Sequence, residues 1–281
     1  GECIITADHG NAEELMENLK IACIGTGAMG GAILSSICKK YNPQNITVAD
    51  KNTESAKNFA QKNNCNFKES NIDAIQNADF IILAVKPNVI SIVLKEIQNH
   101  ISEKTVVISM AAGISIQSLN SFAPNARFIR IMPNMPALVG QAMIALSCND
   151  NISKDELNNA KTILESAGKV EQVEEKLMDC VTGVSGSGPA FVFMFIEALA
   201  DAAVKCGMPR QQAYIYAAQT VKGSADVVLQ TSRHPAELKD AVCSPGGTTI
   251  DGVAALENNN FRNAVIQAVE AAYKKSINLG K

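Results

Sequence analysis

The sequence has no tryptophan, and it holds only three histidines among 281 residues. No histidine and cysteine residues are grouped at metal-ligand spacing, so we expect no metal site. The formal net charge of −3 argues against a protein that binds the phosphate backbone of nucleic acids. No apolar run reaches the roughly 18 residues that a membrane helix needs. These absences leave an ordinary globular protein, long enough for one large domain or two smaller ones.

The eight cysteines are scattered, and none forms a CxxC pair. This spacing is typical of reduced, mostly core cysteines in a cytosolic protein. No signal peptide is recognisable, and we therefore expect a soluble, cytoplasmic protein.

Apolar runs alternate with helical stretches in the first half of the chain. The predicted strands are residues 20–24, 46–50, 79–85, 105–110, 127–131 and 141–147. The predicted helices lie between the first glycine turn and residue 40, at 53–62 and at 89–99. Continuously apolar strands separated by helices are typical of a parallel sheet covered on both faces. The pattern predicts an α/β fold whose N-terminal domain is a doubly wound Rossmann domain.

The sequence becomes rich in alanine and loses its strand pattern after about residue 176. The predicted helices are residues 190–206, 211–230, 235–242, 249–257 and 261–279. Their apolar residues are too numerous for a small solitary bundle, so we expect burial against a second subunit, with an intramolecular core as the alternative. Those residues are Met194, Phe195, Ile215, Val227, Val228 and Val265. We divide the chain into an extension (1–18), a Rossmann domain (19–178) and an all-α dimerisation and substrate domain (179–281).

A GxGxxG turn follows the first strand and opens the first helix, which is the context that the dinucleotide motif requires. We expect Gly25 to permit the tight turn, Gly27 to let the backbone approach a pyrophosphate, and Gly30 to let helix and strand pack closely. The helix N-terminus offers unpaired N–H groups to the phosphates. The remaining cofactor-binding residues of this turn are Thr26, Ala28 and Met29.

The second predicted strand ends at Asp50, where an acid usually binds the ribose hydroxyls of NAD. Lys51 and Asn52 follow and are suited to hold a 2′-phosphate instead. The residues alone leave NAD and NADP open.

Ligands of a doubly wound sheet lie beyond the carboxyl ends of its strands. The expected crevice residues after the third and fourth predicted strands are Ala84, Val85, Lys86, Pro87, Ala111, Ala112 and Gly113. Asn134 lies between two prolines in a stiff loop, so we expect it to present a polar side chain near the nicotinamide.

A second small-residue loop begins a helix in the all-α domain. Thr248 and Asp251 fit a capping box, and we expect the N–H groups of Gly247, Thr248 and Thr249 to point outward. Such a loop predicts a receptor for a small anion such as a carboxylate. The predicted substrate-binding residues are Ser244, Gly246, Gly247, Thr248 and Thr249. No Ser/His/Asp set accompanies them. A protonated imine is electrophilic before hydride arrives and suits a site without a dedicated proton donor.

The chain resembles the pyrroline-5-carboxylate reductase family from about Leu19 to Leu279. The motifs that carry the resemblance are DCVTGVSGSGPA (179–190), HPAELKD (234–240) and SPGGTTI (244–250), supported by GTGAMG, LAVKP, SMAAGI and RIMPNMP. The resemblance implies hydride transfer from NADPH, or NADH, to the C=N bond of L-1-pyrroline-5-carboxylate, which gives L-proline. It also implies a homodimer through the helical domain, with larger assemblies of dimers common in the family.

The same resemblance implies roles for single residues. The loop from Ser244 to Thr249 would hold the substrate carboxylate, with the hydroxyl of Thr249 near the ring nitrogen as the catalytic group. Asn134 and Lys86–Pro87 would lie near the nicotinamide. Because family members more often prefer NADPH, we expect NADPH despite Asp50.

The first 18 residues depart from the family pattern. Thr6 to Glu13 resembles a metal-ligand stretch of cofactor-independent phosphoglycerate mutases, but the other ligands of such a site are absent, so we interpret it as an extension or fusion remnant.

Two alternatives are weighed against this interpretation. A β-hydroxyacid dehydrogenase would carry a catalytic lysine on the first long helix of the second domain, and residues 191–203 contain none. A protein that binds NAD(P)H without turnover should have lost the substrate loop, which is present.

Overall fold

The computed structural model describes residues 18–279, so the metal-ligand-like stretch of the predicted extension lies outside the described residues. The chain forms two compact units. One comprises the described residues up to Gly186 together with those from Tyr273 onward, and the other comprises Ser187–Ala272. The expected domain division after residue 178 falls within a short helix, α8 (Met178–Val181).

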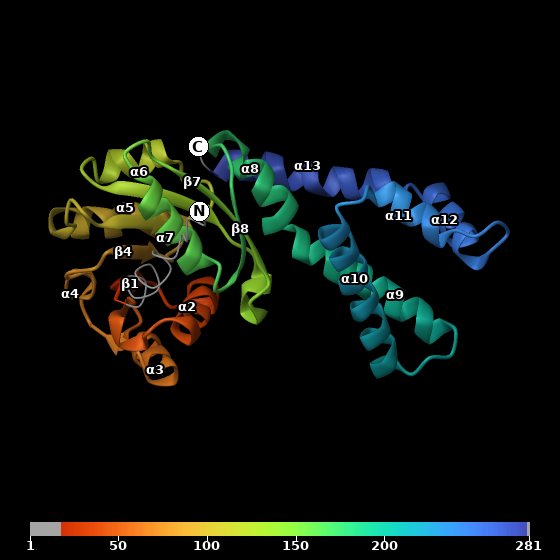
Figure 1. Cartoon of the computed structure of the whole chain (residues 1–281), viewed down its shortest axis with the longest axis horizontal. Helices are drawn as coiled ribbons and strands as arrows, with labels where there is room; N and C mark the ends of the chain where they lie inside the picture. Colours follow the sequence, from red (N-terminus) through yellow and green to blue (C-terminus); the bar gives the residue numbers. More distant parts are fainter. Residues whose placement is uncertain (1–17, 280–281) are drawn as a thin grey trace, which may run out of the picture. The chain divides into compact units, whose positions relative to one another are not determined.

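The first unit is built on an eight-stranded sheet in the order β3-β2-β1-β4-β5-β6-β7-β8 (Figure 1). Its strands are β1 (Ile21–Ile24), β2 (Ile46–Ala49), β3 (Asn66–Phe67), β4 (Phe80–Leu83), β5 (Val106–Ser109), β6 (Arg127–Met132), β7 (Ala142–Cys148) and β8 (Gly168–Gln172). The strand order reverses between β1 and β4, which is the topological switch point of a doubly wound fold. The predicted α/β fold is confirmed.

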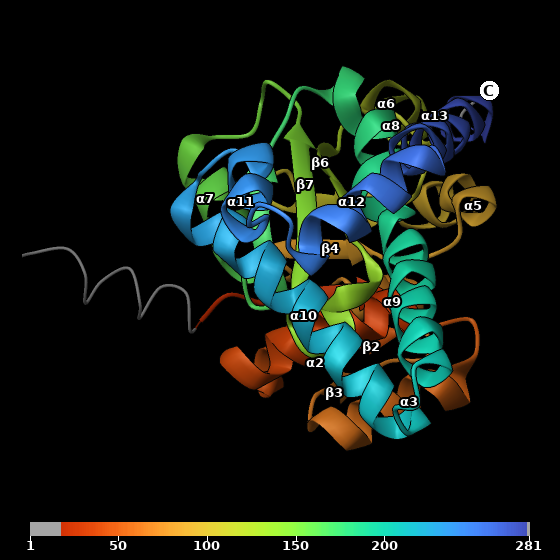
Figure 2. The same ribbon diagram turned by 90° about the vertical axis from the view of Figure 1, so that its right-hand side faces the viewer.

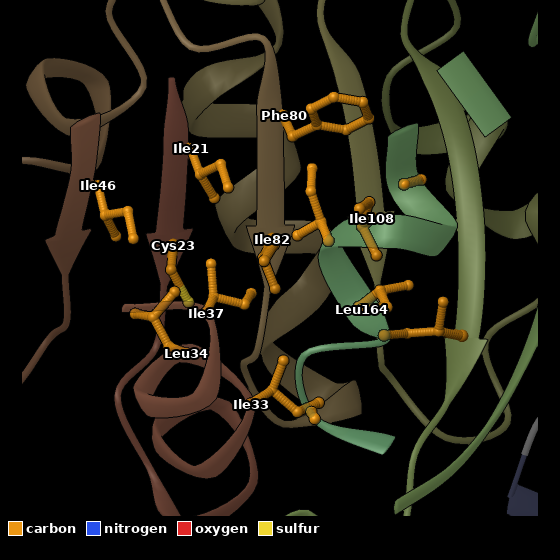
Figure 3. Packing of buried hydrophobic residues seen from close by; sticks show 14 of the residues in the cluster. Ile21, Cys23, Ile33, Leu34, Ile37, Ile46, Phe80, Ile82, Ile108 and Leu164 are labelled. Atoms are coloured by element: carbon orange, nitrogen blue, oxygen red, sulfur yellow. The ribbon is translucent and has the colours of Figure 1, made fainter. Parts of the chain in front are cut away.

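Helices cover both faces of this sheet. They are α2 (Ala28–Lys40), α3 (Thr53–Asn63), α4 (Asn71–Ala74), α5 (Pro87–Ile97), α6 (Ile116–Phe122) and α7 (Lys154–Leu164). One buried cluster lies under α2, α3 and α7, and the other lies under α4, α5 and α6. In the first cluster, Ile37 of α2 lies beside Cys23 of β1 and Ile82 of β4 (Figure 3). The two apolar faces explain why the central strands contain no polar alternation.

The sheet differs in one respect from the all-parallel sheet that the sequence predicts. β7 runs antiparallel to β6, with Arg130 opposite Ser147, and β8 then runs parallel to β7. A short turn, η3 (Met135–Val139), joins β6 to β7, and a connection that short suits a reversal of direction better than a parallel crossover. The remaining short segments of this unit are η1 (Pro43–Asn45), η2 (Gln98–His100), η4 (Glu175–Leu177) and the π-helix η5 (Thr182–Gly186).

The second unit is helical, as predicted. It contains α9 (Gly188–Lys205), α10 (Arg210–Thr231), α11 (Pro235–Val242), α12 (Thr248–Asn258) and most of α13 (Phe261–Leu279). α9 and α10 pack against each other through Ala200, Ala213 and Ala217 (Figure 2). These three alanines are the buried cluster of this unit, so most of its apolar surface has no partner within the described chain.

The cysteines differ in part from expectation. All those described are free thiols, as predicted, but only Cys23 and Cys38 among them are buried. Cys180 and Cys206 are exposed on the helical segments, so the prediction of mostly core cysteines is wrong.

Candidate active site

The glycine turn has the geometry that the sequence predicts at its two ends. Gly25 adopts φ +104°, and a Cβ atom there would lie 2.6 Å from the carbonyl oxygen of Ala84. A Cβ on Gly30 would lie 2.5 Å from the Cβ of Ala84. Because neither position tolerates a side chain, the tight turn at Gly25 and the close packing at Gly30 are confirmed.

Gly27 is different, because the protein itself does not require a glycine there. It is the exposed N-cap of α2, and a Cβ atom built on it meets no heavy atom within 4 Å. No side chain caps this helix start and no acid lies in its first turn, where Ala28 and Met29 are the first two helical residues. The first N–H groups of α2 thus have no side-chain partner, and no side chain at Gly27 fills the space beside them.

Asp50 follows β2 and lies beside the glycine turn. Its Oδ2 accepts hydrogen bonds from the N–H of Thr26 at 2.7 Å and from the Thr26 hydroxyl at 3.2 Å. Its Oδ1 accepts one from the N–H of Asn52 at 2.9 Å. The Asp50 carboxylate, which the sequence predicts to bind ribose, is thus hydrogen-bonded to Thr26 and Asn52 of the protein itself.

Lys51 and Asn52 lie at the same edge but differ in their surroundings. Lys51 is exposed. Asn52 is the N-cap of α3, and its Oδ1 accepts the N–H of Ser55 at 3.1 Å. The hydroxyl of Ser55 lies 3.4 Å from that of Thr26. Ser55 is absent from the predicted site, and no sequence signal marks it, because an N-cap side chain accepts the backbone N–H of any residue at that spacing.

The other predicted crevice residues gather at the same sheet edge. Parallel pairing places Ile24 beside Leu83 and Leu83 beside Ser109, so the segments that follow β1, β4 and β5 are neighbours. Ala84 and Val85 follow β4, Lys86 is the exposed N-cap of α5 and Pro87 is its first residue. Beyond β5, after Met110, come Ala111, Ala112 and Gly113, with φ +75° at Gly113.

Asn134 lies just beyond β6, and its side chain is bound at both ends. Its Oδ1 accepts the N–H of Met143 at 2.9 Å, and its Nδ2 donates to the carbonyl oxygen of Ser185 at 3.0 Å. The residue is 8% exposed. These bonds join the β6–β7 turn to the π-helix η5, and a role near the nicotinamide stays a prediction.

The loop from Ser244 to Thr249 differs in detail from the predicted anion receptor. The N-cap of α12 is Gly247 rather than Thr248, and no side chain caps the helix, so the predicted capping box is wrong. The N–H of Gly247 donates to the carbonyl oxygen of Ser244 at 3.0 Å and does not point outward. Gly246 needs its glycine for φ +66°, which lets the chain turn into the helix.

Thr248 and Thr249 are the first two residues of α12. Their N–H groups lie at an uncapped helix start, with Thr248 exposed and Thr249 half-buried. The arrangement offers backbone donors and hydroxyls to an anion, and the polar contact of Ser244 with Gly247 shapes the turn before them.

Comparisons with known proteins place this arrangement in a family. A family model described as pyrroline-5-carboxylate reductase dimerisation matches residues 175–279, and one described as NADP oxidoreductase, coenzyme F420-dependent, matches residues 20–113. A Synechocystis protein named pyrroline-5-carboxylate reductase is 43% identical over 267 residues, which cover 94% of this chain and 99% of that protein. The chain belongs to the pyrroline-5-carboxylate reductase family.

Solved structures of family members have the same fold. The pyrroline-5-carboxylate reductase of Coxiella burnetii has a TM-score of 0.88 at 34% identity and covers 94% of this chain and 99% of that chain. The Plasmodium falciparum pyrroline carboxylate reductase with NADP bound has a TM-score of 0.84 at 34% identity, with 95% and 100% covered. As a family member the chain is an NAD(P)H-dependent oxidoreductase, and the match over residues 20–113 assigns NADP binding to the Rossmann domain.

Membership of the family also accounts for the apolar surface of the helical unit. Met194 is 69% exposed, Ile215 67% and Val265 43%, and the dimerisation model spans all three. Phe195 and Val227 are also exposed, whereas Val228 is half-buried. The predicted burial against a second subunit is confirmed as dimerisation.

One segment within the same match, Glu175–Lys205, is long and apolar enough by length and composition to cross a membrane. The expectation from the sequence concerned only uninterrupted apolar runs. This segment contains small and polar residues between its apolar ones, so it is not such a run, although its mean hydropathy is high. Only 6% of its apolar window is buried within the chain, as expected of a helix that packs on a partner.

Proposed function

We infer that this protein reduces the C=N bond of L-1-pyrroline-5-carboxylate with hydride from NADPH, and with NADH as the alternative donor, to give L-proline. The observation that carries the inference is the identity of 43% with a pyrroline-5-carboxylate reductase over 94% of the chain, which spans both units. Neither unit alone would specify the reaction, because a Rossmann domain serves many oxidoreductases.

The residues at the sheet edge fit a dinucleotide. The open space at Gly27, the uncapped start of α2 and the small residues after β4 and β5 leave room for a pyrophosphate and a ring. The bound cofactor supplies the hydride. The protein's own part is to fix the pyrophosphate at Gly25–Gly30 and to hold the adenosine end near Asp50–Asn52.

The substrate is a small ring acid, and the α12 start provides groups for its two polar ends. The N–H groups of Thr248 and Thr249 bind the carboxylate together with Ser244 and the turn at Gly246 and Gly247. The hydroxyl of Thr249 hydrogen-bonds the ring nitrogen, which becomes an amine when the C=N electron pair moves onto it. Because the imine is protonated before the transfer, this site needs no separate acid at neutral pH.

Further features belong to the same proposal. Asn134 fixes the loop that borders the nicotinamide through its bonds to Met143 and Ser185, and Lys86 and Pro87 line the same end.

The dimers associate into a larger assembly, and the protein works in the cytoplasm. The first 18 residues have no part in the reaction.

The test is a spectrophotometric assay on the purified protein. Loss of reduced-nicotinamide absorbance is followed with pyrroline-5-carboxylate and each cofactor in turn, and proline is measured as the product. We expect one proline per NADPH oxidised. No oxidation with either cofactor, by a protein that binds both, would exclude this substrate.

A further inference from the structure

The carboxylate of Glu175 joins two segments of the sheet unit that are far apart in the sequence. Its Oε1 accepts the N–H of Ile116 at 2.6 Å and a hydrogen bond from Nη1 of Arg130 at 3.1 Å. Ile116 is the first residue of α6, Arg130 lies in β6, and Glu175 is the first residue of η4. One oxygen atom therefore ties the start of a helix to a strand of the sheet.

Arg130 is a charged residue in the interior of this unit. Its side chain is 5% exposed, and its partners in strand register are Ser109 of β5 and Ser147 of β7, which are also buried. Its Nε has no hydrogen-bond partner among residues 18–279. A buried ion pair adds little net stability, and apolar side chains of similar size often replace one without loss. The pair is therefore better explained by the geometry that it fixes than by the stability that it adds.

The helix start that Glu175 binds is also the end of the loop after β5. This loop, residues 110–115, is held at its beginning, where the N–H of Met110 donates to the carbonyl oxygen of Leu83 at 3.2 Å. At its end, Ser115 is the N-cap of α6, and the next N–H is the one that Glu175 accepts. A negative side chain is favoured there by the helix dipole as well. Glu175 thus fixes the second end of the loop.

The middle of the same loop packs beside Arg130. Ala112 packs against a small buried cluster that consists of Met132, Ala145 and Met178. Met132 follows Arg130 by two positions in β6, and side chains two apart in a strand point to the same face of the sheet. The loop therefore rests on the face of β6 from which Arg130 extends, so loss of the ion pair is expected to loosen its position.

We propose that Arg130 and Glu175 are positioning residues that hold residues 111–113 against the ring end of the bound cofactor. The inference rests on the proposed function, in which the small residues after β5 leave room for that ring. Glu175 acts through the N–H of Ile116, and Arg130 acts by holding the carboxylate in place. NADPH and NADH share the nicotinamide ring, so the positioning serves both cofactors equally.

The first experiment measures binding to the purified protein. NADPH and NADH are followed by the fluorescence of the reduced nicotinamide, and ADP is followed by its displacement of NADPH. Glu175→Ala should weaken both reduced cofactors by a common factor on the order of tenfold, the effect of one lost charge-assisted hydrogen bond. ADP lacks the nicotinamide, so its dissociation constant should change less than about twofold.

Glu175→Gln is the conservative variant. Both hydrogen bonds of the carboxylate are made by one oxygen, and an amide oxygen can accept both of them. This variant should therefore recover most of the cofactor affinity that Glu175→Ala loses.

The second experiment tests whether Arg130 acts through Glu175. Arg130→Met removes the guanidinium and should weaken both reduced cofactors by a smaller factor, about threefold. The double variant Arg130→Met with Glu175→Ala should bind them no more weakly than Glu175→Ala alone, because the two residues act in series. The double variant leaves no unpaired charge in the interior, so it replaces Glu175→Ala in the comparison if that variant does not fold.

Two further variants control for effects on the fold. Arg127→Met breaks another ion pair of β6, with Glu156 of α7 on the opposite face of the sheet. It should lower stability to urea and leave the three affinities as in the parent. Glu174→Ala removes the exposed carboxylate next to Glu175 and should change neither stability nor affinity.

Specific outcomes would overturn the inference. Parent-like cofactor affinity in Glu175→Ala or in the double variant would show that the pair does not position the loop. An equal loss of affinity for ADP and NADPH would show that the pair only supports the fold. A double variant whose loss is the product of the two single losses would separate Arg130 from Glu175. If the parent protein binds neither reduced cofactor, the proposed function itself fails, which the parent measurement alone reveals.

Discussion

A Cβ atom on Gly30 would lie 2.5 Å from the Cβ of Ala84, so the first turn of α2 packs directly on the residue that follows β4. The same construction at Gly27 meets nothing within 4 Å. Two glycines three residues apart thus have different reasons to be glycine. One is required by packing, and the other is left open toward the space where a ligand would lie.

This contrast gives the first prediction. Gly27→Val should fold like the parent and raise the KM for NADPH at least tenfold, because the new side chain enters the space of the pyrophosphate. Gly30→Ala should instead lose roughly 1–3 kcal/mol of stability through overpacking. Urea unfolding of both variants, together with cofactor titration, separates the two effects. Parent-like kinetics in Gly27→Val would refute its assignment.

Thr249 is the residue on which substrate chemistry is expected to depend. Thr249→Ala should lower kcat/KM for pyrroline-5-carboxylate by about 10- to 100-fold, the effect of one lost hydrogen bond at the reacting nitrogen, without weakening NADPH binding. Thr249→Ser keeps the hydroxyl and should retain most of the activity. An alanine variant as active as the parent would remove Thr249 from the site.

The exposed apolar surface of α10 predicts the consequence of a charge at the dimer interface. Ile215 is 67% exposed within the chain, and Ile215→Asp should shift the protein toward monomer at micromolar concentration, because a buried unpaired carboxylate is costly. Sedimentation velocity measures the shift. Lys57→Glu, on α3 of the other unit, is the control and should leave the mass unchanged. A fully dimeric Ile215→Asp would place the interface elsewhere on the helices.

The start of α7 predicts a pH dependence of stability. Burial of Glu156 would raise its pKa, but hydrogen bonds from the Ser153 N–H and hydroxyl and the contact with Arg127 at 2.7 Å outweigh this and lower the pKa below its usual value of 4.5. The charged form is therefore favoured in the folded state, so its stabilisation is complete above pH 4.5 and is lost as the pH falls through the lower folded pKa.

Glu156→Gln tests this, because glutamine also serves in a capping box, while the substitution removes the charge and one of the two acceptor oxygens. The variant should be less stable than the parent by about 1 kcal/mol at pH 7. The difference should shrink toward zero near the pH at which the parent carboxylate is protonated. Urea unfolding at a series of pH values checks it, and a difference independent of pH would contradict the prediction.

Much of the fold is predictable from local patterns, and the omissions have physical causes. The central strands are buried throughout and apolar except for Ser109, and the glycine turn follows the first of them, so both are evident in the sequence. β3 has two residues and the edge strand β8 is largely exposed, so neither carries an apolar pattern. α7 is not among the predicted helices, although Ser153 and Glu156 form the capping box that marks its start.

The residues of the candidate site also separate into those that local sequence patterns predict and those that only the folded chain brings together. The sequence by itself determined the glycine turn, the acid at the end of β2 and the small-residue start of α12, because each is a property of neighbouring residues. Only the tertiary structure decided that the Asp50 carboxylate accepts hydrogen bonds from Thr26, 24 residues away, and that β7 runs antiparallel to β6. The choice of hydrogen-bond partner depends on which strands lie side by side, and packing settles that rather than local pattern.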